Sequence, residues 1–284
     1  MIKVLVPFDF SETAAHALHF AAKLSDNYSQ IQITVLHVLE MPISTGMSTM
    51  GGGMDPIPDF QNQVFFIDML EARKKDLLDL ETKYRNSAFT LRTKLVAGNV
   101  FRSISEAIEK EHPDLVVIGS KGSSGFEEIL IGSNTEKVVR TASCPVITVK
   151  AETEVVKMKK IVFASDFKES NDAVATRFKR IQNLFDAEFF FVIVNTPGSF
   201  ETTRESLSRI RTYVQKHHFK NVKAEVYNAL SEEQGIIDFA DDIDADLIAM
   251  TTHGRTGLLH LLTGSIAEDV VNHSKRPVWT YKTN

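Results

Sequence analysis

The sequence predicts an α/β protein of two tandem, doubly wound domains, each with a five-stranded parallel sheet and helices on both faces. Three observations predict it: an internal repeat, apolar runs of strand length without polar alternation, and amphipathic stretches of helix length between those runs. Alternating strands and helices favour parallel sheets, whose strands are buried on both faces and therefore apolar throughout. The repeated segments are Val6–Glu12 and Phe163–Glu169, Asp114–Ile118 and Asp246–Met250, and Cys144–Thr148 and Arg276–Thr280.

The repeat also sets the predicted domain boundaries. The first match is offset by 157 residues and the other two by 132, so the first copy carries 25 extra residues in its middle. The extra length falls on Met41–Pro58, which holds four glycines and three prolines and is predicted to be a long mobile loop. We assign residues 1–151 to the first domain and 158–284 to the second, with the charged stretch Glu152–Lys160 as the linker.

The individual elements follow from the apolar pattern. Short runs rich in Val, Ile and Leu are predicted to be strands, and longer stretches with one apolar face are predicted to be helices. The strands of the first copy are predicted at Ile2–Pro7, Gln32–Leu39, Thr90–Ala97, Leu115–Ser120 and Val146–Val149, and those of the second at Lys160–Ala164, Glu188–Asn195, Val222–Asn228, Leu247–Thr251 and Val278–Tyr281. Helices include Ser11–Leu24 and Val64–Arg85. Ligands of such sheets bind beyond the carboxyl ends of the strands, where the strand order reverses.

Composition and charge exclude several classes of protein. The chain of 284 residues has a net charge of −5, which argues against non-specific binding to nucleic acid or to an anionic membrane. Its longest apolar run, Phe189–Val194, is too short to span a bilayer, and its start lacks the layout of a signal peptide. The single cysteine, Cys144, fits a reducing compartment and is expected to be buried and inert. We therefore expect a cytoplasmic protein.

A glycine pattern follows the fourth strand of each copy. Glycines let backbone N–H groups approach an anion closely, and a helix start attracts phosphate through its free N–H groups. The alternative is purely structural, because Ser133 and Ser265 each begin an S-x-x-E sequence, which forms a capping box at a helix start. The first copy has Gly119, Gly122, Gly132 and Ser133 in the pattern G-x2-G-x9-G-[ST], and the second keeps Gly254, Gly264 and Ser265 but has Thr251 at the first position.

Acidic residues follow the first strand of each copy. Asp9 and Asp166 are placed to accept hydrogen bonds from a base amino group or a ribose hydroxyl, or alternatively to cap the next helix. Gly98 follows the third strand and is expected to turn the chain near a ribose, with Asn228 as its counterpart. The chain has no G-x-x-x-x-G-K-[ST], G-x-S-x-G or H-E-x-x-H sequence, so no catalytic residue and no metal site are predicted.

Together these motifs resemble those of the universal stress protein family, and both copies are similar to it over nearly the whole chain. The resemblance implies an adenine nucleotide alpha hydrolase-like fold that binds ATP or AMP, with Asp9 of a P-x-D sequence and Val38 at the base or ribose. It places the first nucleotide site at Pro7, Phe8, Asp9, Val38, Gly98, Ile118, Gly119, Lys121, Gly122, Gly132, Ser133, Asn134 and Thr135. It places a second site at Ser165, Asp166, Val194, Thr251, His253, Gly254, Gly264 and Ser265.

The resemblance further implies a regulatory protein of the stress response that changes its contacts with an unidentified protein partner when nucleotide binds. Mg²⁺ is expected beside any bound polyphosphate, because Lys121 is the only lysine of the motif and backbone donors with a helix dipole neutralise a triphosphate incompletely. One alternative is an interaction protein of the same fold that binds no nucleotide. Another is a nucleotidyltransferase-like enzyme, although Pro7–Phe10 stands where that class carries an H-x-G-H-type motif. Slow ATP hydrolysis is left open.

The final strand of each copy, Val146–Val149 and Val278–Tyr281, is expected to lie at a sheet edge with unpaired backbone groups. Two related edges pair antiparallel about an approximate twofold axis, as they do in dimers of single-domain members of the resembled family. We therefore expect the two copies to join as an intramolecular pseudo-dimer. A homodimer of the whole chain is also left open.

Overall fold

The computed structural model describes residues 1–28, 30–40, 57–85, 87–121, 131–150, 158–168, 172–185, 187–253 and 266–283. Its strands are β1 (Ile2–Pro7), β2 (Ile31–Leu39), β3 (Thr90–Ala97), β4 (Leu115–Gly119), β5 (Val146–Val149), β6 (Lys160–Ala164), β7 (Glu188–Asn195), β8 (Val222–Asn228), β9 (Leu247–His253) and β10 (Val278–Thr283). Its helices are α1 (Glu12–Lys23), the short 3-10 helix η1 (Leu24–Asp26), α2 (Ile57–Lys83), α3 (Val100–Glu111), α4 (Ser133–Thr141), α5 (Asp172–Leu184), α6 (Thr203–Lys216), α7 (Glu232–Asp242) and α8 (Ile266–His273).

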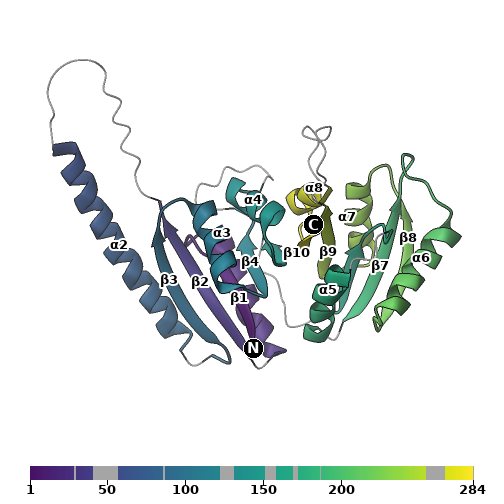
Figure 1. The fold of residues 1–284 in the computed structure, drawn as a ribbon, viewed down its shortest axis with the longest axis horizontal. Coiled ribbons are helices and arrows are strands. Elements are labelled where there is room, and N and C mark those ends of the chain that lie inside the picture. The colour runs from purple at the N-terminus through teal and green to yellow at the C-terminus, as the bar shows by residue number, and fades with distance from the viewer. Residues whose placement is uncertain are drawn as a thin grey trace, which may run out of the picture.

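The ten described strands form one continuous sheet in the order β3-β2-β1-β4-β5-β10-β9-β6-β7-β8 (Figure 1). Neighbouring strands within each copy run parallel, whereas β5 and β10, which join the copies, run antiparallel. In the first copy the chain moves outward from β1 to β3 and then returns to β4 on the other side of β1. The strand order therefore reverses between β1 and β4, as the predicted doubly wound fold requires.

The element bounds agree closely with those predicted from the sequence, with two informative differences. β9 and β10 each extend two residues further than predicted because they continue to pair with each other as far as His253 and Thr283. α2 begins at Ile57, seven residues before the predicted start, with Pro58 in its first turn, where a missing N–H costs no helical hydrogen bond. The rest of the predicted loop, residues 41–56, lies outside the described residues.

Helices cover both faces of the sheet. In the first copy α1 and α2 cover one face, where Val4 and Leu77 are buried, and α3 and α4 cover the other, where Leu5 and Val138 are buried. Successive residues of a strand point to opposite faces, so neighbours in β1 enter different cores. The last turns of α2 pack on the sheet: Leu77 is buried, and the half-buried Leu80 and Tyr84 pack against the same cluster. Phe66 and Leu70, earlier in the helix, are half-buried.

The two copies share a buried core where β5 meets β10. Ile147 lies opposite Trp279, and both side chains belong to a cluster that also includes residues of α1 and α5. The Thr148 hydroxyl donates to a carbonyl of β10 at 3.3 Å, and the Thr280 hydroxyl donates to a carbonyl of β5 at 3.4 Å. The two contacts are related by an approximate twofold axis, so the antiparallel pairing expected of the final strands is present.

The single cysteine is buried, as expected. Cys144 lies in the cluster beneath α3 and α4. Burial raises the pKa of its thiol to about 12, which leaves very little of the reactive thiolate at neutral pH. In the part of the chain that the structure describes, no helix combines the length and the apolar character needed to cross a membrane.

The substitution Val278→Lys tests the junction between the copies. Val278 is 1% exposed and pairs with Thr148 across the junction, so a lysine there buries an unpaired charge. We expect the free energy of unfolding, measured by urea denaturation, to fall by roughly 3–5 kcal/mol. Leu230 is 90% exposed, and Leu230→Lys should change that free energy by less than about 0.5 kcal/mol. Equal stability of the two variants would contradict the buried junction.

Candidate functional site

The first predicted site lies along the carboxyl edge of the first copy. Its residues follow β1, β2, β3 and β4, and the register of these parallel strands puts their ends at the same edge of the sheet. Pro7 and Phe8 are buried there, Asp9 and Val38 are half-buried, and Gly98 forms the turn after β3. The structure therefore brings these predicted residues to one edge, beside the point where the strand order reverses.

A tight turn after β1 presents Asp9. Phe10 takes a left-handed conformation with φ 63°, and its counterpart Phe167 does the same with φ 50°. Asp9 Oδ1 accepts hydrogen bonds from the Ser11 backbone N–H at 3.0 Å and from the Ser11 hydroxyl at 2.5 Å. Ser11 itself caps α1 by accepting from the Ala14 N–H. The alternative that Asp9 caps α1 is therefore wrong: its carboxylate braces the turn and stays half-exposed.

A buried histidine that the sequence analysis missed supports this turn. His37 Nδ1 donates to the Phe8 carbonyl at 2.6 Å, and burial lowers the pKa of the imidazole, so the ring is neutral at pH 7. The Phe10 ring meets both His37 and Phe8 edge to face with centroids 5.0 Å apart, and the Arg73 guanidinium lies 4.8 Å above it. These contacts offset the roughly 1–2 kcal/mol cost of a left-handed residue. A lone histidine inside an apolar strand was the available sequence signal.

Gly119 ends β4 at a place with no room for a side chain. A Cβ atom there would lie 2.8 Å from the backbone carbonyl carbon of Thr13 and 2.9 Å from the backbone nitrogen of Ala14. Thr13 Oγ1 donates to the Lys121 carbonyl, and Thr135 Oγ1 donates to the Gly119 carbonyl at 2.9 Å. α1 and α4 thus hold this segment from both sides, and helix packing alone requires the first glycine of the motif.

The start of α4 differs from the prediction. Gly132 is the N-cap residue and Ser133 is the first helical residue, exposed to solvent, so the predicted capping box from Ser133 to Glu136 is wrong. No side chain among the described residues caps α4, and its first N–H groups have no partner within the helix. Gly132 has φ −64° and ψ 144°, which any residue adopts, so backbone strain does not explain this glycine.

Gly98, in contrast, is required by its backbone. Its φ of 147° lies in a region that other residues rarely adopt, and its N–H donates to the Leu39 carbonyl at 3.0 Å. In the second copy the Ala229 N–H makes the equivalent bond to the Asn195 carbonyl, also at 3.0 Å. The predicted counterpart, Asn228, is therefore wrong by one residue, and the two edges differ in shape at this turn.

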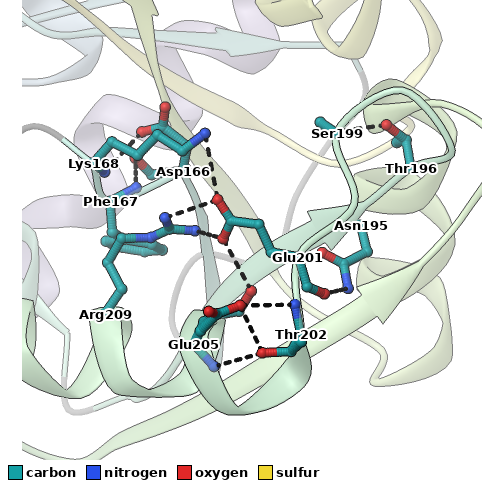
Figure 2. A network of polar contacts seen from close by, with 12 residues as sticks. Asp166, Phe167, Lys168, Asn195, Thr196, Ser199, Glu201, Thr202, Glu205 and Arg209 are labelled. Carbon is teal, nitrogen blue, oxygen red and sulfur yellow. Dashed lines mark hydrogen bonds and ion pairs between the residues drawn. The ribbon is translucent and has the colours of Figure 1, made fainter.

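The second predicted site lies beside an ion-pair network (Figure 2). Glu201 accepts hydrogen bonds from two nitrogens of Arg209, which lower the pKa of its carboxyl, and it pairs with Lys168 at 3.5 Å. The Lys168 backbone N–H donates to Asp166 Oδ1 at 3.1 Å, and Asn195 Nδ2 donates to the Glu201 carbonyl at 3.0 Å. These contacts fix the loop between β7 and α6 beside Asp166.

Other second-site residues are engaged in packing. A Cβ on Gly235 would lie 2.5 Å from Val194 Cγ1, so α7 packs directly on Val194. Ser165 Oγ accepts from the Phe167 N–H at 3.2 Å and braces the turn after β6. Thr251 lies within β9, whose last residue is His253. The predicted site residues outside the described residues are Gly122, Gly254, Gly264 and Ser265.

No arrangement of protein ligands for a metal ion is found among the described residues. A group of three or more His, Cys, Asp or Glu side chains placed to share a cation is absent from them. What the first edge offers instead is a half-buried carboxylate at Asp9 and a helix start at Ser133 that no side chain of the described residues caps. Chemically, the first accepts hydrogen bonds and the second attracts an anion.

The fold and the carboxyl edge of the first copy together define a tandem, doubly wound α/β protein. In its first copy, helix α4 begins at a glycine beside the point where the strand order reverses. The universal stress protein family matches residues 1–150 and again residues 157–282. The chain belongs to this family.

The relatives that match show how far the likeness extends. Universal stress protein MJ0577 of Methanocaldococcus jannaschii is 28% identical over 154 residues, which cover 52% of this chain and 94% of that protein. Universal stress protein YxiE of Bacillus subtilis is 30% identical over 154 residues, which cover 52% and 98%. The crystal structure of a universal stress protein from Archaeoglobus fulgidus aligns with a TM-score of 0.73 at 21% identity, covering 99% of this chain and 96% of that one. This last likeness shows that the fold extends across both copies.

Gly119→Ala tests the close packing of α1 on β4. The added methyl would lie under 3.0 Å from the backbone of Thr13 and Ala14, so α1 must shift. We expect the free energy of unfolding to fall by about 1–3 kcal/mol, as in other overpacked sites. The control is Gly198→Ala, because a Cβ on Gly198 meets nothing within 4 Å. If both variants unfold at the same urea concentration, the packing argument fails.

Proposed function

We propose that this protein is an adenine-nucleotide-binding regulator of the stress response in the cytoplasm, with its principal site at the carboxyl edge of the first copy. The observation that carries the proposal is the start of α4, a glycine N-cap that no described side chain supplements, followed by the exposed Ser133. Such a helix start binds phosphate through its backbone N–H groups and its dipole. The pattern G-x2-G-x9-G-[ST], shared with ATP-binding members of the family, supports ATP or AMP as the ligand.

The base and ribose are assigned to the ends of β1, β2 and β3. Asp9 is half-exposed and carries a carboxylate that accepts hydrogen bonds from a base amino group or a ribose hydroxyl. Val38 and Gly98 end the neighbouring strands and offer backbone groups at the same edge. The buried Pro7 and Phe8 shape the turn and hold Asp9 in place.

The phosphates are assigned to the start of α4. Ser133 is exposed there and adds a hydroxyl donor, and Asn134 is half-buried beside it. Lys121 follows Ser120, whose carbonyl accepts the Gly132 N–H, and is assigned to supply a positive charge for the phosphates. Ile118 and Thr135 are each 5% exposed, so these residues contribute through their backbone alone.

The second copy is proposed as a weaker site, and here the alternative of an interaction module has a specific observation in its favour. The network of Glu201, Arg209 and Lys168 bonds the polar groups beside Asp166 to one another. A ligand would have to compete with these contacts. Mass spectrometry of small molecules released from the purified, denatured protein distinguishes a nucleotide-binding protein from an interaction protein. One nucleotide per chain indicates one occupied site, and the absence of nucleotide indicates an interaction protein.

The proposal also assigns a role to the junction. We infer that the pairing of β5 with β10 replaces, within one chain, a contact between two single-domain proteins, so the two copies act as a pseudo-dimer. A regulatory partner would then contact both copies as one rigid unit. Nucleotide in the first copy would change the contacts that this unit makes with that partner.

Gly132→Val tests the phosphate end of the site. The φ and ψ of Gly132 suit valine, so the fold should survive, while the added side chain stands among the N–H donors that begin α4. We expect calorimetry to show ATP binding at least about tenfold weaker than in the wild type, a loss of ~1.4 kcal/mol. Gly198→Val, in a loop with open space, is the control and should bind like the wild type. Unchanged ATP affinity in a folded Gly132→Val protein would sink the assignment.

Mg²⁺ should accompany a bound polyphosphate. The described residues offer no three-ligand group for a cation, so the phosphate oxygens themselves would provide most of its ligands, as Mg²⁺ sites with nucleotides commonly do. We expect ATP affinity to fall when a chelator replaces Mg²⁺, and adenosine affinity to stay the same. Equal ATP affinity with and without the chelator would rule out a role for the ion.

A further inference from the structure

The residue just before the start of α4 belongs to the core of the second copy. Ile131, which directly precedes Gly132, is 9% exposed and sits in a cluster whose other buried residues all come from the second copy, mostly from β6, β7, β9, β10, α7 and α8. Its backbone N–H donates to Asn272 Oδ1, in the last turn of α8, at 2.9 Å. Both the side chain and the backbone of Ile131 are therefore held by the second copy.

The same asparagine is held in turn by the first copy. Lys150, just after β5, donates through Nζ to the Asn272 main-chain carbonyl, at the end of α8 where the helix dipole attracts a cation. Burial, and to a smaller extent the charge of Lys121, lower the pKa of Lys150 to about 8. Ile131, Asn272 and Lys150 together form what we call the interdomain strap.

The strap joins two antiparallel helices near the centre of the molecule (Figure 1). The start of α4 meets the end of α8 through the strap. The end of α4 meets the start of α8 through Arg140 Nε and Glu268 Oε1, which are 3.0 Å apart. α8 comes directly after the second glycine motif, so one short helix connects the second predicted site to the first.

The strap is asymmetric although the copies are related by an approximate twofold axis. The offset of 132 residues makes Arg140 the counterpart of Asn272. An arginine side chain carries donors and no acceptor, so it cannot receive a backbone N–H as Asn272 does. Asn272 of the second copy therefore accepts a backbone hydrogen bond from the first copy, and its counterpart Arg140 cannot accept one from the second.

We propose that Asn272 is a positioning residue for the first nucleotide site, acting through Ile131 on the N–H groups that begin α4. The inference rests on the proposed function, because it takes that helix start as the seat of the phosphates. Gly132 N–H donates to the Ser120 carbonyl at 2.7 Å, so the helix start is fixed between β4 on one side and the strap on the other. Loss of the Asn272 amide removes one of the hydrogen bonds that hold this helix start, and hydrogen bonds to phosphate weaken steeply when donors are misaligned.

The strap should affect the phosphate end of the ligand and not its base or ribose. The proposed base and ribose contacts belong to the first copy alone: Asp9 lies in the turn after β1, and Val38 lies near the end of β2. Loss of the strap should therefore weaken binding of a ligand with phosphates and spare binding of adenosine. A general loss of structure would weaken both.

The test compares Asn272→Ala with Arg140→Ala, which removes the other contact between α4 and α8 and leaves the strap in place. Hydrogen exchange at the Ile131 amide is measured on the full-length protein without nucleotide, and calorimetry gives the affinities for ATP and adenosine. We expect Asn272→Ala to speed exchange at Ile131 and to weaken ATP binding about tenfold, with adenosine affinity changed less than about twofold. Arg140→Ala should leave all three quantities unchanged. Asn272→Asp, which keeps an acceptor oxygen, should keep the slow exchange at Ile131.

Unchanged exchange at Ile131 in Asn272→Ala overturns the strap itself. In Asn272→Ala, faster exchange at Ile131 with unchanged ATP affinity overturns the positioning role, and so does an equal loss of ATP and adenosine affinity. Faster exchange with selectively weaker ATP binding in Arg140→Ala also overturns it. A wild-type protein that binds neither ATP nor adenosine overturns the proposed function and this inference with it. That failure is distinguishable, because the exchange measurement reports on the strap without any nucleotide.

Discussion

Where β5 meets β10, Trp279 lies opposite Ile147 and packs against Phe178 with ring centroids 5.6 Å apart. Without this contact, each final strand would be a sheet edge with unpaired backbone groups and apolar side chains in water. Pairing merges two five-stranded sheets into one and makes one face of the core continuous across the copies. The placement of α4 beside α8, and each contact between them, depends on that pairing.

The inner strands, such as β1 and β4, were predictable because a parallel strand covered on both faces is apolar along its length, and such runs recur in the second copy. The site was less predictable at the level of single residues. The S-x-x-E pattern at Ser133 suits a serine just before a helix, and a shift of one residue, set by the Gly132 N–H bond to the Ser120 carbonyl, turns the serine into the first helical residue. No sequence motif indicates a role for Asn272, because the residue that it bonds, Ile131, is 141 positions away in the chain.

The two copies share one fold but carry different side-chain contacts at the carboxyl edges of their sheets. In the first, a carboxylate braces its own turn and stays half-exposed, and a buried imidazole holds that turn from beneath. In the second, a short loop after β7 is tied down by Glu201, Arg209 and Lys168. The fold is thus shared, while the polar contacts at the carboxyl edge differ between the copies.

The asymmetry between Asn272 and Arg140 has a consequence for how such a protein can evolve. In a dimer of identical subunits these two positions are one residue of one gene, so any change at the interface appears twice and must suit both sides. A tandem chain is released from that rule. One copy can become a dedicated ligand-holding unit while the other specialises as its scaffold, a division of labour that no homodimer of identical chains can encode.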